Sequence, residues 1–176
     1  MRVVAGRLGG RIFDSPRGHR THPMSEKARG AIFNALGDIN GLSVLDAYAG
    51  SGAIAIEAAS RGAAKAVAIE VDIEAVKTIA RNIAMLQLED TVQVLRKNIS
   101  GWSKNNVDKK FDVVVVDPPY DDIRPDVVER LTNHLADGGV FVLSWPGSEP
   151  VRQFKGFELV SHKPLGDIQL TFYKRI

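Results

Sequence analysis

Short apolar runs, each followed by polar residues, divide most of this chain into predicted strands. Four consecutive valines precede Asp117, and such an unbroken apolar run is typical of a strand buried on both faces of a parallel sheet. Apolar and polar positions instead alternate near the C-terminus, which indicates a strand with one buried face. The predicted core strands are residues 42–46, 66–70, 92–95, 113–116 and 140–144, followed by a hairpin of residues 157–162 and 168–173.

Between the strands, the spacing of apolar residues changes to the helical period. Ser25 is a suitable N-cap and Gly37 a suitable stop for a helix with apolar residues at i, i+3, i+4 and i+7. Residues 54–60, 73–84 and 125–134 are predicted as further helices, and residues 101–110 as a polar loop. This order predicts an α/β fold with a mostly parallel seven-stranded sheet, helices on both faces and an antiparallel C-terminal hairpin.

Composition narrows the class of protein. The chain has 176 residues, 44% hydrophobic and 25% charged, which is typical of one globular domain. It has no cysteine, so disulfides and thiolate metal sites are excluded. No apolar stretch is long enough to span a bilayer, and we expect a cytoplasmic protein. We also expect no metal site, because His19 and His22 lack a third ligand nearby.

Cationic residues are concentrated near the N-terminus, although the net charge is only +2. Residues 1–40 contain seven of them against three acidic residues. We expect a basic arm over residues 1–24, with a short hairpin, and a separate domain over residues 25–176. Such an arm indicates either a polyanionic partner or a solvated basic surface. The candidate contacts to a polyanion are Arg7, Arg11, Arg17, Arg20, Lys27 and Arg29.

The turn after the valine run brings three chemical groups to one edge of the sheet. Neither Pro118 nor Pro119 can donate a ladder hydrogen bond, so the chain leaves the sheet at its carboxyl edge, where open α/β sheets bind ligands. The Asp117 carboxylate and a backbone carbonyl could accept both hydrogens of a planar amine while Tyr120 covers the base. Taken alone, this motif is interpreted equally well as a simple turn with a packing tyrosine.

A glycine-rich turn follows the strand at residues 42–46. Gly50 and Gly52 belong to a G-x-G-x-x-A pattern, which by itself would suit a dinucleotide pyrophosphate. Asp46, however, stands four residues before Gly50, where an acid can bind a cationic amine instead. No Lys-Ser/Thr pair follows the glycines, so a phosphate-binding P-loop is excluded.

Polar residues also end the next two predicted strands. Glu70 lies 24 residues after Asp46, where an acid would bind the two ribose hydroxyls of an adenosine ligand. Asn98 follows the third strand and is either an adenine contact or an ordinary turn residue. The sequence therefore predicts that three acids, Asp46, Glu70 and Asp117, meet at one edge of the sheet.

These motifs together resemble the Rossmann-like, class I S-adenosylmethionine-dependent methyltransferases. Over nearly its whole length the chain resembles the bacterial RsmD family, in the segments THPMSEKARGAIFNALG, VLDAYAGSGAIAIEAASRGA, FDVVVVDPPY and GDIQLTFY. It departs from that family at His22-Pro23-Met24, where Arg-Pro-Thr is expected, at Gly30, where an acid is usual, and at Asn98, where Asp is usual.

The resemblance implies a monomeric enzyme that methylates the exocyclic N2 of a guanine in small-subunit (16S) ribosomal RNA, free or within an assembling subunit. S-adenosyl-L-methionine would be the cofactor, and the cationic residues above would bind RNA. The implied catalytic group is Asp117, Pro118, Pro119 and Tyr120. The implied cofactor site is Asp46, Ala47, Tyr48, Gly50, Ser51, Gly52, Glu70, Val71, Asn98, Ile99 and Asp117.

The chemistry of the central turn agrees with this resemblance. The guanine amino lone pair is delocalised, and acceptors at Asp117 and the Pro118 carbonyl would favour a pyramidal nitrogen. We expect the ring of Tyr120, rather than its hydroxyl, to stack on the base, which contributes ~1–3 kcal/mol. Two alternatives are a DNA adenine-N6 methyltransferase, which the short chain disfavours, and a non-catalytic nucleic-acid-binding domain, which the intact motifs disfavour.

Overall fold

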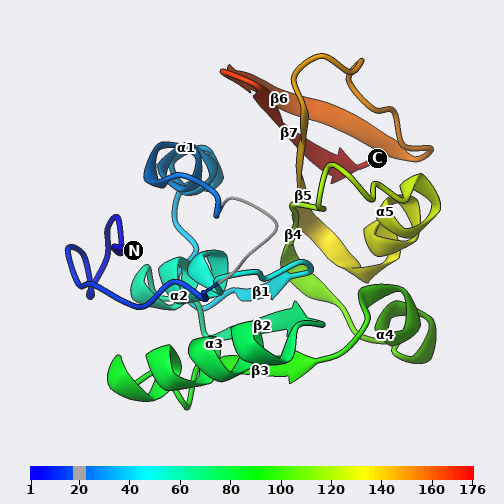
Figure 1. Cartoon of the computed structure of the whole chain (residues 1–176). Helices are drawn as coiled ribbons and strands as arrows, with labels where there is room; N and C mark the ends of the chain where they lie inside the picture. The colour runs from blue at the N-terminus through cyan, green and yellow to red at the C-terminus, as the bar shows by residue number, and fades with distance from the viewer. Residues whose placement is uncertain (18–22) are drawn as a thin grey trace.

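A seven-stranded sheet forms the centre of the protein, as the computed structural model shows for residues 1–17 and 23–176 (Figure 1). Its strands lie in the order β3-β2-β1-β4-β5-β7-β6. The first five are parallel, whereas β7 is antiparallel to both β5 and β6. The predicted fold class is confirmed. The strands are β1 (Ser43–Asp46), β2 (Lys65–Glu70), β3 (Val92–Arg96), β4 (Phe111–Val116), β5 (Leu135–Pro146), β6 (Phe157–Leu165) and β7 (Ile168–Arg175).

Helices cover both faces of this sheet (Figure 1). Buried residues of α1, α2 and α3 pack with one face, and those of α4 and α5 with the other. Within the described ranges, none of the helices combines the length and apolar character needed to cross a membrane. The helices are α1 (Glu26–Leu36), α2 (Ala53–Ser60), α3 (Ile73–Met85), α4 (Ile99–Asn105) and α5 (Pro125–Leu131), followed by the 3-10 turn η1 (Thr132–His134).

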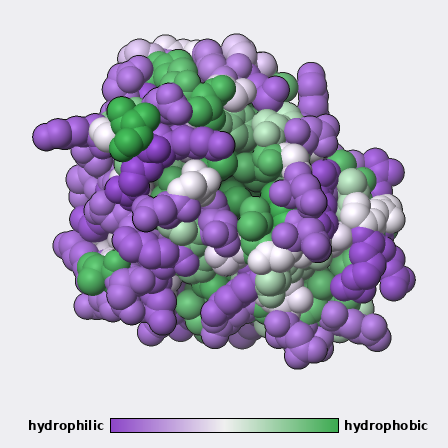
Figure 2. Space-filling view, turned by 180° about the vertical axis from the view of Figure 1, so that it is seen from behind, coloured by the Kyte–Doolittle hydropathy of each residue, from purple (hydrophilic) through white to green (hydrophobic). Residues whose placement is uncertain are grey.

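The four valines of β4 show why apolar runs predicted the sheet. Val113 and Val115 belong to the cluster under α1 to α3, whereas Val114 and Val116 belong to the cluster under α4 and α5. Successive strand residues point to opposite faces, so a strand covered on both sides needs apolar residues at every position. Figure 2 shows the complementary pattern on one outer face, where hydrophilic side chains cover most of the surface and hydrophobic atoms lie in its recessed centre.

The prediction of a polar loop at residues 101–110 is wrong for its first half, because residues 101–105 belong to α4. The side-chain oxygen of Asn98 caps this helix by accepting from the backbone N–H groups of Ser100 and Gly101, at 3.0 and 3.2 Å. Trp102 is buried there against Phe111 and His134. Burial of Trp102 and the Asn98 cap therefore both contribute to holding this short polar helix in place.

The N-terminal segment packs on the domain through its apolar residues. Val3, Leu8 and Phe13 are buried in the cluster of α1 to α3. In the region of the predicted short hairpin, an antiparallel bridge joins Arg2 to Ile12, and the N–H of Val3 donates to the carbonyl of Arg11 and that of Phe13 to the carbonyl of Met1. This segment covers the outer side of α2, so all eight residues of that helix are buried between it and the sheet.

Side chains of α2 and α3 hold the backbone of the same segment. The carboxylate of Glu57 accepts from the N–H groups of Val4 and Ala5 at 2.7 and 3.0 Å. Asn82 bonds both the N–H and the carbonyl of Asp14, at 2.9 and 2.8 Å. Because these contacts are made to the backbone, they fix the path of the segment without using its side chains.

Candidate active site

The predicted site residues meet where the strand order reverses. The chain proceeds from β1 to β2 and β3 on one side, and from β4 to β5 on the other, so β1 and β4 are neighbours. Asp46 ends β1 opposite Val115, and Asp117 directly follows β4. In open α/β sheets, such a switch point forms a crevice at the carboxyl ends of the strands, and ligands bind there.

The glycine loop between β1 and α2 is held by the next acid. Gly50 and Gly52 have φ values of 53° and 74°, in the left-handed region that glycine adopts readily. The Glu70 carboxylate accepts from the N–H of Gly50 at 2.7 Å and, through its other oxygen, from those of Val71 and Asp72, both at 2.8 Å. Glu70 thus fixes the loop. The oxygen that accepts from Val71 and Asp72 has both lone pairs occupied, so only the oxygen that accepts from Gly50 keeps a further lone pair for a ligand.

Asp46 is a buried carboxyl group with few hydrogen bonds to stabilise its charge. It is 2% exposed and accepts one long hydrogen bond, 3.3 Å, from the N–H of Ala55. Burial raises the pKa of Asp46 to about 8, and the negative charges of Asp117 and Glu70 contribute to the rise. Burial likewise raises the pKa of Asp117, while hydrogen bonding by the Ser144 hydroxyl opposes that rise. The crevice is therefore suited to positive charge.

Tyr120 lies beside these acids. Its hydroxyl is 2.8 Å from the Ser144 hydroxyl, and its side chain is only partly covered, at 38% exposed. Burial of the hydroxyl raises the pKa of Tyr120 to about 12, and the charge of Asp117 adds to this effect. Pro118 is buried and Pro119 is half-buried, so the turn itself is firmly seated. The prolines, the acid and the ring thus lie together at the crevice.

The other predicted cofactor residues differ in how far they are accessible. Ala47 and Ser51 are buried in the loop, Tyr48 is half-buried, and Val71 is 60% exposed next to Glu70. Ile99 is buried as the first residue of α4. Asn98 is exposed, and because its oxygen caps α4, only its amide hydrogens are free to contact a ligand.

Arg29 does not belong with the exposed cationic residues. It is 1% exposed, and its guanidinium donates to the carbonyls of Met24 and Arg2 at 2.9 and 2.6 Å. The prediction that Arg29 is available to phosphate is wrong, because the N-terminal segment folds over this side of α1. Lys27, on the same helix, is exposed.

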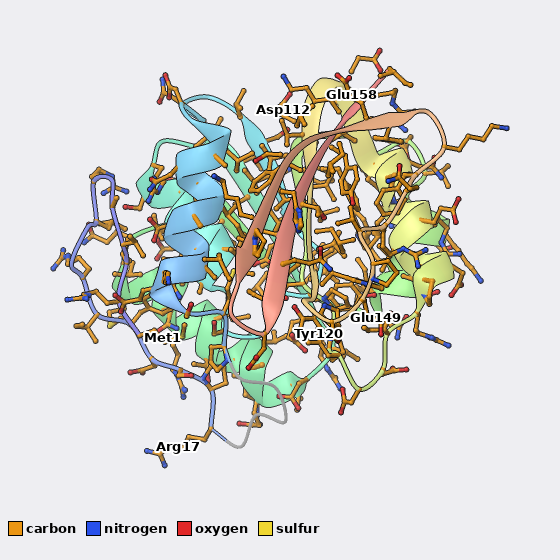
Figure 3. All side chains as sticks on the ribbon, turned by 90° about the horizontal axis from the view of Figure 1, so that it is seen from above. Met1, Arg17, Asp112, Tyr120, Glu149 and Glu158 are labelled. Atoms are coloured by element: carbon orange, nitrogen blue, oxygen red, sulfur yellow. The ribbon has the colours of Figure 1, made fainter. Side chains whose placement is uncertain are left out.

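The other predicted RNA contacts lie at different ends of the arm. Arg17 is exposed and lies at the end of the molecule that carries Tyr120, whereas Asp112 lies at the opposite end (Figure 3). The backbone of Arg7 bonds Ser60, at the end of α2 remote from the glycine loop. Arg11 is exposed as well. Arg20, His19 and His22 lie outside the described residues.

Two buried polar residues near the site were not predicted. Ser144 is 1% exposed and bonds Tyr120. Gln169 is 3% exposed and donates to the carbonyls of Pro146 and Glu149, which fixes the chain after β5. Figure 3 shows Glu149 and Tyr120 at the same end of the molecule. For Ser144 the available signal was a polar residue at the end of an apolar strand that adjoins the valine run. The prediction that the strand of Gln169 has only one buried face is wrong, because residues 169–173 of β7 are all buried.

Comparisons with known proteins identify relatives over the whole chain. The family model described as "Conserved hypothetical protein 95" matches residues 1–174. The ribosomal RNA small subunit methyltransferase D of Escherichia coli is 31% identical over 79% of this chain, and that of Buchnera aphidicola (Acyrthosiphon pisum) is 32% identical over 67%. These alignments span 68% and 62% of the two relatives' own lengths. The solved structure of the E. coli protein yhhF has a TM-score of 0.87 at 26% identity, covering 99% of this chain and 97% of that one.

Proposed function

The chain belongs to the RsmD family of methyltransferases, and from this premise we propose that it methylates the exocyclic N2 of a guanine in small-subunit ribosomal RNA. One observation carries the proposal. A half-buried carboxyl group, Asp117, directly follows β4 at the switch point, beside the buried acid Asp46 and the partly exposed ring of Tyr120. This arrangement supports the capture of a flat base that carries an amino group.

The acids of the crevice fit a cationic cofactor. Asp117 and Glu70 each raise the pKa of Asp46, so these groups repel one another when ionised. A positive charge among them relieves that repulsion, whereas a dinucleotide pyrophosphate adds to it. S-adenosyl-L-methionine, when bound, supplies a methyl group on a cationic sulfur that is a good leaving group. The loop of Gly50 and Gly52 would hold it, with Glu70 at its ribose and Asp46 near its amino group.

The catalytic contribution of the chain is orientation. The Asp117 carboxylate and the Pro118 carbonyl accept the two hydrogens of the guanine amine, and the lone pair of the nitrogen then points out of the base plane. Tyr120 stacks on the base, which must leave its helix to bring its amine to the half-buried Asp117. The exposed cation Arg17, at the same end of the molecule as Tyr120, binds the RNA backbone (Figure 3).

The direct test is methyl transfer from isotopically labelled S-adenosylmethionine. Small-subunit RNA, the same RNA in ribonucleoprotein particles, and adenine-containing duplex DNA are offered in parallel, and the products are digested to nucleosides. We expect label in N2-methylguanosine, and the comparison of free RNA with particles identifies the substrate form. Label in N6-methyladenine, or none in any nucleic acid, would refute the proposal.

A matched pair of variants tests whether the activity depends on Asp117. Asp117→Ala should reduce the rate by ~100-fold or more and should affect cofactor affinity far less, because its main partner is the target amine. Asp112→Ala removes a carboxylate from the same strand at the opposite end of the molecule (Figure 3). This control should transfer methyl at the rate of the parent.

Light scattering on the same samples tests the proposed monomeric state.

A further inference from the structure

A buried hydroxyl on β5 connects the two residues to which the proposed function assigns the target base. β4 and β5 are parallel neighbours in which Val116 lies opposite Leu143. The next residue along each strand is Asp117 and Ser144, so the register brings these two side by side at the carboxyl edge. Ser144 is 1% exposed, and its oxygen is 2.8 Å from the hydroxyl of Tyr120.

The chemistry of the three groups determines the direction of the hydrogen bonds. An ionised carboxylate accepts only, whereas a serine hydroxyl has one proton to donate and two lone pairs to accept with. An ionised Asp117, level with Ser144 in the strand register, therefore favours the arrangement in which the proton of Ser144 faces the carboxylate and Tyr120 donates its own proton to the Ser144 oxygen. The effect of Ser144 in lowering the pKa of Asp117, against burial, is consistent with this direction.

Resting on the proposed function, we propose that Ser144 is a positioning residue for methyl transfer, whose hydroxyl fixes the Tyr120 ring beside the Asp117 carboxylate. Tyr120 lies in the turn between β4 and α5 and is 38% exposed, so packing alone leaves one side of the ring open. The bond to Ser144 holds the far end of the ring, and its open face stays available to a base whose amine is at Asp117. The ring is thus oriented before the base arrives, so binding costs less side-chain entropy.

The same bond gives the Tyr120 hydroxyl a function that the sequence did not indicate. From the sequence, stacking needed only the ring, so Tyr120→Phe was expected to be mild. In the structure, that substitution removes the partner of Ser144 and frees the ring. Ser144→Ala removes the other half of the same bond.

A double-mutant cycle on single-turnover methyl transfer to ribosomal RNA tests the proposal. Ser144→Ala and Tyr120→Phe should each slow the transfer by about fivefold to tenfold, the consequence of one lost hydrogen bond, with cofactor affinity unchanged. The double variant should be no slower than Ser144→Ala, because Tyr120→Phe removes only the bond that this variant has already lost. Ser103→Ala is the matched control: it removes a buried serine hydroxyl that bonds His134 at 2.8 Å on α4, so stability falls and the rate does not.

A second measurement does not depend on activity. In protein with 13C-labelled tyrosine, the chain has three tyrosine signals, and loss of one in Tyr120→Phe assigns that residue. Ser144→Ala should shift the Tyr120 signal, whereas Ser103→Ala should not. An unshifted signal, a Ser144→Ala rate equal to the parent's, or additive effects in the cycle would each overturn the inference. A parent enzyme without transfer to RNA would overturn the proposed function instead, while the tyrosine signal would still report on the bond itself.

Discussion

Replacing Asp46 with asparagine should make the protein more stable while it abolishes cofactor binding. The pKa of Asp46 rises from 3.8 to about 8 on folding, mainly because the carboxyl group is buried. Between these two pH values the folded chain keeps a proton that the unfolded chain has lost. The free energy of unfolding of the parent therefore falls as the pH rises from about 4 to about 8. The Asp46→Asn variant has nearly the same shape, can still accept from Ala55 and carries no charge to bury.

The structure sets the size of this effect. At about 1.4 kcal/mol per pH unit, a rise from 3.8 to about 8 limits the gain to about 6 kcal/mol. Relaxation of the site and water entry reduce such penalties, so we expect a gain of about 2–4 kcal/mol above pH 8. For a chain of this length, 1 kcal/mol shifts the melting temperature by roughly 2–4 °C. The variant should then melt roughly 5–15 °C above the parent at pH 8.5, with the difference closing towards pH 4.

Thermal unfolding by circular dichroism, at pH steps from 4 to 9, measures this difference. Asp112→Asn is a control of the opposite sign, because hydrogen bonds from the backbone N–H and hydroxyl of Ser43 lower the pKa of Asp112. That variant should be less stable than the parent at neutral pH, and its deficit should close as the pH falls. Calorimetry with S-adenosylmethionine should find no binding to Asp46→Asn. A variant that melts with the parent at pH 8.5, or a difference independent of pH, would refute the reasoning.

Three further results are expected. Glu70→Ala should weaken S-adenosylmethionine binding by about 1–3 kcal/mol in calorimetry, because the glycine loop loses its bond at Gly50 and the ribose loses an acceptor. Arg17→Gln should weaken RNA binding and lower the slope of log affinity against log salt by roughly 0.7–0.9, more than Arg7→Gln does at the other end of the arm. Arg29→Met should lower the free energy of unfolding by about 2–3 kcal/mol in denaturant titrations, because two bonds from a buried guanidinium are lost, and should leave RNA affinity unchanged.

The sheet and its carboxyl edge could be predicted because their signals are local. A strand covered on both faces requires apolar residues at consecutive positions, and the valines of β4 satisfy that requirement without reference to any other segment. The acid or turn that follows each strand then marks the ligand edge. The same local logic failed for α4, whose residues are mostly polar, because that helix depends on burial of Trp102 against Phe111 and His134.

Contacts between distant segments account for what the sequence did not indicate. Arg29 lies off the apolar stripe of α1, as expected for an exposed residue. Its burial arises from the carbonyl of Arg2, 27 residues away, in a segment that has few apolar residues of its own. Ser144 gains its role only because β5 lies beside β4 in a register that brings it level with Asp117. Neither the burial of Arg29 nor the position of Ser144 follows from composition or periodicity, since both depend on which segments pack together in the folded chain.

The charges of the crevice also constrain how RNA approaches it. Asp46, Glu70 and Asp117 make the interior of the site favourable to a cationic cofactor and unfavourable to phosphate. An RNA backbone drawn towards the acids would be repelled, so the phosphates must stay outside while one base reaches in. The side chains that meet the base first are then neutral: the open face of Tyr120, held from behind by Ser144. On the proposed function, attraction of the backbone and recognition of the base are therefore carried out by separate groups, and exposed cations such as Arg17 should influence affinity without altering the rate of methyl transfer from the bound complex.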